Sequence, residues 1–320
     1  MEPLVEVQGL TRRFGALSAV DGLDLEVRPA EMFGLIGPDG AGKTTTLRMI
    51  LGLLRPDAGR VTTCGLDPVR QRRRLASQVG YLSQKFSLYG DLSVDENIAF
   101  FASIRDVFRF ARRRDELLEL VRMTPFRSRL ADRLSGGMKQ KLALVCTLVH
   151  TPRLLVLDEP TTGVDPVSRR DFWKLLTRLQ REGLTILLTT PYLDEAERCT
   201  RVALVDHGRL LTVDTPDALR GGASGVLVEV VADPRRRAAE VLRTVPGVGE
   251  VESFGERLHA TLPDARSADA TTAAEHLESH LRDAGVSVSS CRPTTPSLED
   301  VFIARIRSQS TAPGAPEVLP

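Results

Sequence analysis

The feature that most constrains the fold is a glycine-rich loop at residues 37–44. It reads Gly-Pro-Asp-Gly-Ala-Gly-Lys-Thr and fits the P-loop pattern G-x-x-x-x-G-K-S/T. The apolar run Met32–Ile36 precedes it and predicts a buried strand, and residues 45–54 follow with helical periodicity. Such a unit binds phosphate because loop N–H groups and the positive helix end face one anion. All fixed positions and both flanks match, so a ligand-free glycine turn explains the pattern poorly.

Residues within the loop have separate chemical uses. Gly37, Gly40 and Gly42 let the backbone turn sharply and come close to a ligand. Lys43 can reach the terminal phosphates of a nucleotide, and the hydroxyl of Thr44 can hold Mg²⁺. The loop therefore predicts a site for a nucleotide together with a metal ion.

Two carboxylates, Asp158 and Glu159, end a second apolar run at residues 153–157. Ligands of an open α/β sheet bind at the carboxyl ends of its strands, and carboxylates placed there are costly without a cation or a role. Asp158 suits Mg²⁺ ligation, directly or through water, and Glu159 suits a general base acting on water. A capped strand end before Pro160 is the alternative, which the P-loop makes less favoured.

A second glycine-rich segment, residues 134–140, reads Leu-Ser-Gly-Gly-Met-Lys-Gln and stands at the entry to an apolar helix. Ser135 is placed as the N-cap, and Gly136 and Gly137 leave their backbone N–H groups open. Alone this is an ordinary helix cap. Beside a P-loop in the same chain, it indicates a second anion-binding helix start.

Composition excludes several classes of protein. The 320 residues include 43 Lys and Arg against 42 Asp and Glu, so a nucleic-acid partner is not favoured. The longest apolar runs are strand-sized, well below the roughly 20 residues of a membrane span. The first ten residues lack the pattern of a signal peptide. The four cysteines are scattered without metal-like spacing, which indicates thiols in a reducing cytoplasm.

The N-terminal region predicts short strands at residues 5–10 and 23–27. The connection between them, residues 11–22, contains Phe14, an aromatic side chain that could stack on a purine base. Most such aromatic residues serve packing, so this signal is weak by itself.

A helical block interrupts the alternation of strands and helices. A short strand at residues 79–83 ends at Gln84, and residues 87–132 are strongly helical. Ser93 opens a capping box, Ser-Val-Asp-Glu, at the start of one of these helices. We interpret the block as an insertion into the α/β domain.

The C-terminal region follows a glycine-rich linker at residues 221–225. Its order of strand, helix, strand, strand, helix and strand predicts a small α+β domain of the ferredoxin-like type. A closing helix is expected at residues 297–307, and the Pro/Ser/Ala-rich residues 308–320 are expected to be disordered.

Taken in order, these motifs resemble the ATP-binding subunit of an ABC transporter over roughly residues 2–220. Residues 134–140 resemble the ABC signature, the most diagnostic segment. The C-terminal region is similar to the extension of ATPases that serve ABC-2-type exporters, including drug-efflux systems. The other matches are Phe14 (the base-stacking aromatic), residues 37–44 (Walker A), Gln84 (the Q-loop glutamine), residues 154–159 (Walker B with the catalytic glutamate) and residues 163–165 (the D-loop).

The resemblance implies an α/β P-loop NTPase of the ABC cassette type at residues 1–222, with a helical insertion at about 88–140. The α+β ferredoxin-like domain would span residues 223–307, before the disordered tail. ATP and Mg²⁺ are the implied cofactors. Glu159 and Gln84 would be catalytic, and Thr44, Gln84 and Asp158 would surround the metal. The implied nucleotide-binding residues are Phe14, Gly37, Asp39, Gly40, Ala41, Gly42, Lys43, Thr44, Thr45, Asp158, Ser135, Gly136 and Gly137.

The family also implies partners and a location. Two cassettes sandwich two ATP molecules, so a dimer with itself or a similar chain is expected, bound to an ABC-2-type transmembrane permease. The chain is then an ATPase that powers export from the inner, cytoplasmic face of the cell membrane. The alternative is a degenerate, ATP-gated subunit that binds ATP with little hydrolysis beside a more active partner. A non-transport ATPase, as in DNA repair or translation, is a more remote rival.

Two positions depart from the family pattern. Asp39 stands where Asn is usual, at a variable position of the loop. Pro191 stands where the family has a switch histidine, and it has neither a side-chain donor nor a backbone N–H. Loss of one such contact commonly costs ~10²–10³ in rate, so slowed hydrolysis is expected. Thr190 or Tyr192 is the hypothetical source of a substitute hydroxyl.

Overall fold

The computed structural model describes residues 2–85, 88–222, 225–266 and 269–310. Its contacts divide the chain into two units, Met1–Pro216 and Asp217–Pro320. Among these described residues, the first unit contains two sheets and the second contains one. Among the described residues, no helix combines the length and the apolar character that crossing a membrane requires.

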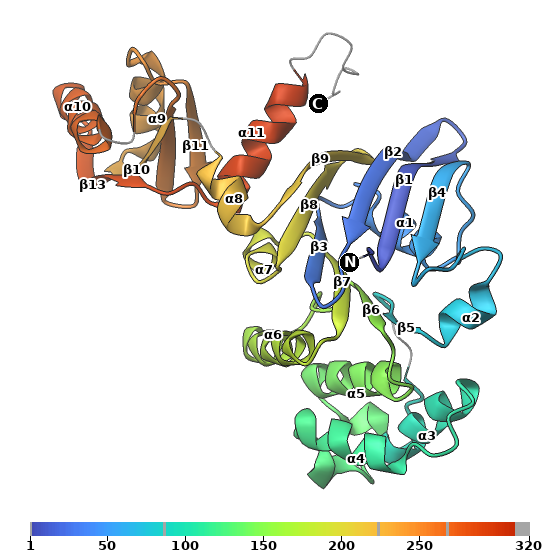
Figure 1. The fold of residues 1–320 in the computed structure, drawn as a ribbon. Helices are drawn as coiled ribbons and strands as arrows, with labels where there is room; N and C mark the ends of the chain where they lie inside the picture. Colours follow the sequence, from blue (N-terminus) through green and yellow to red (C-terminus); the bar gives the residue numbers. More distant parts are fainter. Residues whose placement is uncertain (1, 86–87, 223–224, 267–268, 311–320) are drawn as a thin grey trace. The chain divides into compact units, whose positions relative to one another are not determined.

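A six-stranded sheet forms the centre of the first unit (Figure 1). Its first five strands are parallel and the sixth is antiparallel. The inner strands are continuous buried runs, as expected of a parallel sheet covered on both faces. The carboxyl ends of three neighbouring strands, at Ile36, Asp158 and Thr190, therefore meet at one edge of this sheet. In spatial order the strands are β5 (Val79–Leu82), β6 (Leu154–Asp158), β7 (Thr185–Thr190), β3 (Met32–Ile36), β8 (Arg201–Asp206) and β9 (Arg209–Asp214).

A smaller antiparallel sheet has the order β2 (Leu17–Val27), β1 (Val5–Phe14), β4 (Ala58–Thr63). The prediction of a connection at residues 11–22 was wrong, because β1 and β2 continue as a hairpin almost to its tip. The register between them shifts at several points, and Gly9 and Gly22 adopt positive φ. Irregularities of this kind hide the two-residue alternation that marks a strand.

The helix that follows the P-loop, α1 (Lys43–Ile50), packs between the two sheets. Its buried face includes Leu47, Met49 and Ile50, which join side chains of both sheets in one apolar core. Helix α6 (Pro166–Arg181) packs against β7, and the short helices α2 (Arg72–Ala76) and α7 (Leu193–Ala196) complete the unit. The loop before α1 is thus anchored at both ends in the core.

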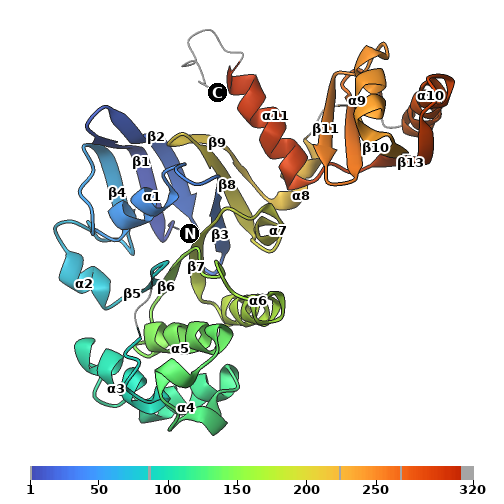
Figure 2. The same ribbon diagram turned by 180° about the vertical axis from the view of Figure 1, so that it is seen from behind.

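The helical block lies together at one end of the unit, drawn in green in Figure 1 and from behind in Figure 2. It contains α3 (Val94–Ile104), α4 (Ala111–Leu120), two 3₁₀ turns (Thr124–Phe126 and Ala131–Arg133) and α5 (Gly136–Leu148). The predicted capping box at Ser93 is confirmed, because Ser93 and Glu96 each accept a hydrogen bond from the other's backbone N–H. Helices α3 and α4 both pack on α5, which also contacts β5.

The second unit has a four-stranded sheet in the order β11-β12-β10-β13, and every neighbouring pair is antiparallel. Helices α9 and α10 pack on the strands and on each other. Buried Val, Leu and Ala side chains of these helices and strands form a separate core. The elements are α8 (Pro216–Gly221), β10 (Val226–Asp233), α9 (Arg235–Thr244), β11 (Glu250–Phe254), β12 (Arg257–Leu262), α10 (Ala270–Asp283), β13 (Ser287–Thr294) and α11 (Leu298–Ser310).

The predicted tail needs one correction. Helix α11 runs to Ser310, so residues 308–310 are helical rather than disordered. Residues 298–312 contain no proline or glycine, so no helix-breaking residue stands between the start of α11 and Pro313. Residues 311–320 and the linker residues 223–224 lie outside the described residues.

Candidate functional site

The P-loop joins the end of β3 to the start of α1, and two of its glycines are fixed by close neighbours. A Cβ at Gly37 would stand 2.1 Å from the carbonyl oxygen of Val205. A Cβ at Gly42 would stand 2.2 Å from the carbonyl oxygen of Ala19, and Gly42 has a φ of 90°. Only glycine fits both places, so the loop's path depends on these residues rather than on a ligand.

Lys43 is folded back over the loop that it follows. Its Nζ donates to the carbonyl oxygens of Gly37 (2.8 Å) and Pro38 (2.9 Å) and lies 3.4 Å from Oε1 of Glu159. The side chain is only 4% exposed, and a buried ammonium group requires such partners. The same atom can turn to an incoming anion if these bonds are exchanged.

Asp158, at the end of β6, is 1% exposed and accepts hydrogen bonds only from uncharged groups in the described part of the chain. The hydroxyls of Thr44 (2.9 Å) and Thr189 (2.8 Å) both donate to its Oδ1, and the Tyr81 hydroxyl lies 3.5 Å from Oδ2. Burial, and next the Asp158 charge, raises the pKa of Tyr81 to about 12. A buried carboxylate beside a threonine hydroxyl, without a basic partner, fits a divalent cation such as Mg²⁺.

Glu159 has a φ of 48°, which is rare for a residue with a side chain. Its backbone N–H donates to both the carbonyl (3.2 Å) and the hydroxyl (3.0 Å) oxygen of Thr189. Its Oε2 accepts a hydrogen bond from Nε2 of Gln84 at 2.9 Å, and its Oε1 faces Lys43. Three separate segments therefore hold a carboxylate in a strained conformation beside the P-loop, a placement typical of functional sites.

Ser135 caps α5, accepting a hydrogen bond from the backbone N–H of Met138 at 3.4 Å. Within the described ranges, no hydrogen bond links residues 135–137 to the P-loop. Gly136 is open to solvent, whereas a Cβ at Gly137 would stand 2.2 Å from the Ser168 hydroxyl of α6. Gly137 is therefore required for packing, a role that the sequence did not reveal.

The remaining predicted residues lie around the loop. Phe14, at the tip of the β1–β2 hairpin, is 47% exposed, and the Arg12 guanidinium lies 4.9 Å from its ring centroid. One face of the Phe14 ring is thus already used in a cation–π contact. Asp39 is exposed, Ala41 is buried and Thr45 is half-buried in the first turn of α1.

The position of the expected histidine lies just after β7. The hydroxyl of Thr190 donates to Oε2 of Glu195 (2.6 Å) and accepts from the backbone N–H of Tyr192 (3.1 Å). Thr190 is therefore occupied as a structural residue. Tyr192 is 39% exposed, and the Arg169 guanidinium lies 4.7 Å from its ring centroid. Of the two residues with a hypothetical substitute hydroxyl, Tyr192 is exposed and Thr190 is buried.

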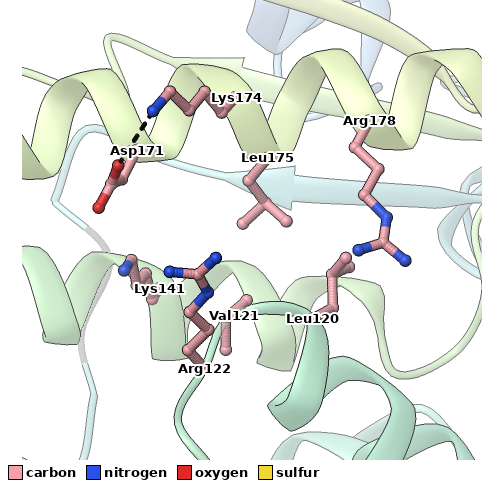
Figure 3. Close-up of a pocket in the computed structure, with 8 residues that line it drawn as sticks. All are labelled: Leu120, Val121, Arg122, Lys141, Asp171, Lys174, Leu175 and Arg178. Carbon is pink, nitrogen blue, oxygen red and sulfur yellow. Dashed lines mark ion pairs between the residues drawn. The ribbon is translucent and has the colours of Figure 1, made fainter.

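A separate cavity of about 190 Å³ lies between the C-terminal end of α4 and the helices α5 and α6 (Figure 3). Arg122, Lys141, Lys174 and Arg178 surround it, and Asp171 makes a 3.9 Å ion pair with Lys174. Its apolar lining residues are Leu120 and Val121 on one side and Leu175 on the opposite side (Figure 3). None of the predicted site residues lines this cavity, so it is distinct from the P-loop site.

Thr189 and Glu195 are the partners that sequence reasoning missed. The Thr189 hydroxyl donates to Asp158 and accepts from the backbone N–H of Glu159. Thr189 belongs to β7, whereas both of these partners lie at the end of β6. Its only signal is a polar residue at the end of a buried strand. Together with Lys43, Gln84, Asp158 and Glu159, it defines a P-loop nucleotide-binding cassette at the carboxyl ends of β3, β5, β6 and β7.

Comparison with known proteins narrows this class. Residues 20–162 match a family model described as ABC transporter. The chain is 40% identical over 323 residues to a probable multidrug ABC transporter ATP-binding protein, YbhF, of Escherichia coli. It is 37% identical to daunorubicin resistance ATP-binding protein DrrA2 of Streptomyces coeruleorubidus and 38% identical to Nod factor export ATP-binding protein I of Ralstonia nicotianae. The chain belongs to the family of ABC transporter ATP-binding proteins, whose cassettes are ATPases.

Coverage differs among these relatives. The match to YbhF covers 97% of this chain and 53% of that protein, so the chain spans about half the length of that relative. The match to DrrA2 covers 93% of this chain and 94% of that protein, and for the Nod factor protein the shares are 94% and 93%.

Solved structures share the fold. An ATP-binding subunit of an ABC transporter superposes with a TM-score of 0.62 at 30% identity, covering 68% of this chain and 92% of its own. The dimeric cassette MJ0796 gives a TM-score of 0.58 at 23% identity, covering 66% and 98%. At that identity the second likeness concerns the fold alone.

Proposed function

We propose that this chain binds and hydrolyses ATP to power export by a separate ABC-2-type membrane permease. The observation that carries the proposal is the convergence of Lys43, Gln84, Asp158 and Glu159 around the P-loop. The printed names of the relatives, which concern drug resistance and export, support the transport assignment. Those names differ in cargo, so the cargo of this chain stays open.

The geometry supports a division of labour among these residues. Lys43 must exchange the P-loop carbonyls and Glu159 for the terminal phosphates when ATP enters. That exchange frees Glu159 to accept a proton from the attacking water, while the Gln84 amide keeps one carboxylate oxygen oriented. Thr44 and Asp158 would hold Mg²⁺, which supplies positive charge against the phosphates when bound.

A dimer follows from the position of the signature. Ser135, Gly136 and Gly137 make no hydrogen bond to this chain's own P-loop within the described ranges. The open helix start at Ser135 suits the phosphates held by a second cassette. That second cassette would be another copy of this chain or a similar chain. MJ0796, whose fold this chain shares, forms a dimeric cassette, which supports the arrangement.

The second unit would be a ferredoxin-like domain with a structural or dimer-stabilising role. Its support is the antiparallel order β11-β12-β10-β13 with α9 and α10 packed on the strands. The permease would contact the helical block near Gln84, so that closure and opening of the dimer are transmitted at the inner face of the cell membrane. Domain limits of 1–222 and 223–307 remain our proposal.

A second candidate function rests on Pro191. Without a histidine after β7, the chain would bind ATP and hardly turn it over, beside a more active partner. Glu159 held by Gln84 and Lys43 counts against this candidate, since a degenerate site has no need of an oriented general base.

The deciding experiment is the rate of phosphate release by the purified chain and three variants. Glu159→Gln should lower turnover about 10²–10³-fold and leave ATP binding intact, because only the proton acceptor is lost. Glu182→Gln, an exposed carboxylate paired with Arg178, is the matched control and should turn over like the native chain. Equal rates for the native chain and Glu159→Gln would overturn the proposal.

Pro191→His separates the two candidates. A gain of about 10-fold or more would mean that the missing histidine is a real deficit, which favours an unequal partner. A brisk native rate that Pro191→His leaves unchanged would make Pro191 a tolerated variant and a working homodimer the simpler arrangement.

A further inference from the structure

Glu195, in the short helix α7, is a buried carboxylate with an unusual number of partners. It is 1% exposed and accepts hydrogen bonds from four side chains. Its Oε1 accepts from Thr161 (2.5 Å), from Nε of Arg169 (2.6 Å) and from Nε1 of Trp173 (3.0 Å), and its Oε2 accepts from Thr190 (2.6 Å). A single carboxylate thus joins the loop after β6, the helix α6 and the end of β7.

Two of these segments flank the reacting centre. Glu159 is fixed to β7 through its backbone N–H, which donates to Thr189. Two residues later, Thr161 is fixed through Glu195 to Thr190, the next residue of β7. The loop that carries Glu159 is therefore attached to consecutive residues of one strand on both sides of Pro160.

The third segment is α6, which begins directly after this loop. Arg169 and Trp173 lie one helical turn apart on α6, and both donate to Glu195. Arg169 also donates to Asp194 at 2.8 Å and 2.9 Å. In the described part of the chain, Arg169 is the one basic residue that forms an ion pair with Glu195. The carboxylate is satisfied, so its cost of burial is offset only while all four donors stay in place.

We propose that Glu195 is a positioning residue for ATP hydrolysis, acting through Thr161 on Glu159 and through Thr190 on the turn that holds Pro191. The inference rests on the proposed function. A misplacement of about 1 Å at a reacting group can cost 10²-fold in rate, so a clamp on the loop of Glu159 acts on turnover. ATP binding depends on the P-loop instead, and none of the four donors belongs to it.

The test uses the full chain and compares Thr161→Val, Thr161→Ser and Glu195→Gln. Thr161→Val removes one donor and keeps the side-chain volume, whereas Thr161→Ser keeps the hydroxyl. We expect Thr161→Val and Glu195→Gln to lower kcat about 10- to 100-fold, with KM and the ATP dissociation constant changed less than about threefold. Thr161→Ser should recover most of the kcat. The unfolding temperature of each variant is measured in parallel, and the ATPase rates are measured well below those temperatures.

The outcomes distinguish the assignment of Glu195 as a positioning residue from the proposed ATPase function. If Glu159→Gln stops turnover while Thr161→Val and Glu195→Gln keep the native kcat, the Glu195 assignment is overturned and the ATPase assignment stands. If Thr161→Ser is as slow as Thr161→Val, the hydroxyl is irrelevant and the assignment also fails. Negligible, equal turnover in the native chain and Glu159→Gln overturns both. Should Glu195→Gln not fold, the Val and Ser pair at position 161 still decides.

Discussion

The two units each bury a carboxylate in a sheet, but they neutralise it differently. Within the residues that the structure describes, Asp158 in the first unit accepts only from the hydroxyls of Thr44, Thr189 and, weakly, Tyr81. Glu229, on β10 of the second unit, is 7% exposed and forms ion pairs with Arg257 (2.8 Å) and Arg292 (2.9 Å). His259 adds a third basic group at 3.8 Å from the same carboxylate.

This difference distinguishes a cation-binding site at Asp158 from a buried charge at Glu229 that supports the fold. A buried charge without a counter-charge is expensive, and a chain keeps it where an external cation completes the balance. A buried charge with internal counter-charges needs nothing further. The contrast therefore assigns chemistry to the edge of the six-stranded sheet and stability to the sheet of the second unit, although Glu195 shows that the first unit uses the second strategy too.

The largest effect is expected from Asp158→Asn. The variant keeps an oxygen that can accept from Thr44 and Thr189, but it removes the charge available to a metal ion. Mg²⁺-dependent phosphate release should fall about 10²–10³-fold, since one preorganised electrostatic contact is lost. Without ligands the variant should unfold at the same urea concentration as the native chain or a higher one, because an uncompensated buried charge is gone. A clear loss of ligand-free stability would contradict the comparison.

Glu229→Gln should give the opposite pair of results. Removal of its charge leaves Arg257 and Arg292 without their shared partner, but both side chains are more than half exposed and can turn to water. The free energy of unfolding should fall by about 1.5–3 kcal/mol, the scale of hydrogen bonds to a charged group, with turnover unchanged. Urea unfolding of the full chain measures this.

Glu240→Gln, on the exposed face of α9 beside Arg236 and Arg237, is the matched control for this substitution. An exposed pair of this kind contributes about 0.3–0.5 kcal/mol, so the control should be nearly silent. If Glu229→Gln were equally silent, the second unit would not depend on its buried charges.

The sequence predicts well the features that depend on one short segment each. The strand Met32–Ile36 was predicted at its observed limits, and α1 begins two residues earlier than expected. The P-loop, the acidic pair and Ser135 all lie on short segments whose spacing alone carries the chemistry. Residues 5–27 were harder, because bulges break the alternation that marks β1 and β2 as one hairpin.

The partners of the site residues could not be predicted, because they depend on pairing between distant segments. Thr189 reaches Asp158 because β6 and β7 are paired neighbours in the sheet, and their register places Asp158 beside Thr189. Glu195 meets Thr161 across 34 positions and Trp173 across 22. In the sequence, Glu195 is one more acidic residue in a charged helix, and nothing there marks it as buried.

The smallest predicted effect concerns pH and the helix α11. Nδ1 of His259 lies 2.8 Å from Oδ1 of Asp300, the residue that also accepts from Ser297 at the start of α11. The hydrogen bond to Asp300 is the main cause that raises the pKa of His259, and the Asp300 and Glu229 charges add to it. Burial opposes ionisation of Asp300, but hydrogen bonds from His259 and Ser297 leave its pKa lowered.

The signs of these two shifts define a pH window. The raised pKa of His259 gives stability that is complete below the ordinary histidine value of about 6.5 and is lost as the pH rises through the raised value. The lowered pKa of Asp300 gives stability that is present above about 3.9 and is lost only as the pH falls through the lowered value. Between those limits both contributions hold, so the loss to be measured lies on the alkaline side.

Urea unfolding of the full chain at pH 6 and pH 9, beside His259→Gln, tests this window. The native chain should lose on the order of 1 kcal/mol more than the variant between these pH values, about the net contribution of one hydrogen bond. Glu229, Arg257 and Arg292 face the same cluster, but all three are also present in His259→Gln, so the comparison with the variant cancels their contribution. An identical pH dependence in both chains would remove His259 from the balanced charges of the second unit and leave the arginines alone to neutralise Glu229.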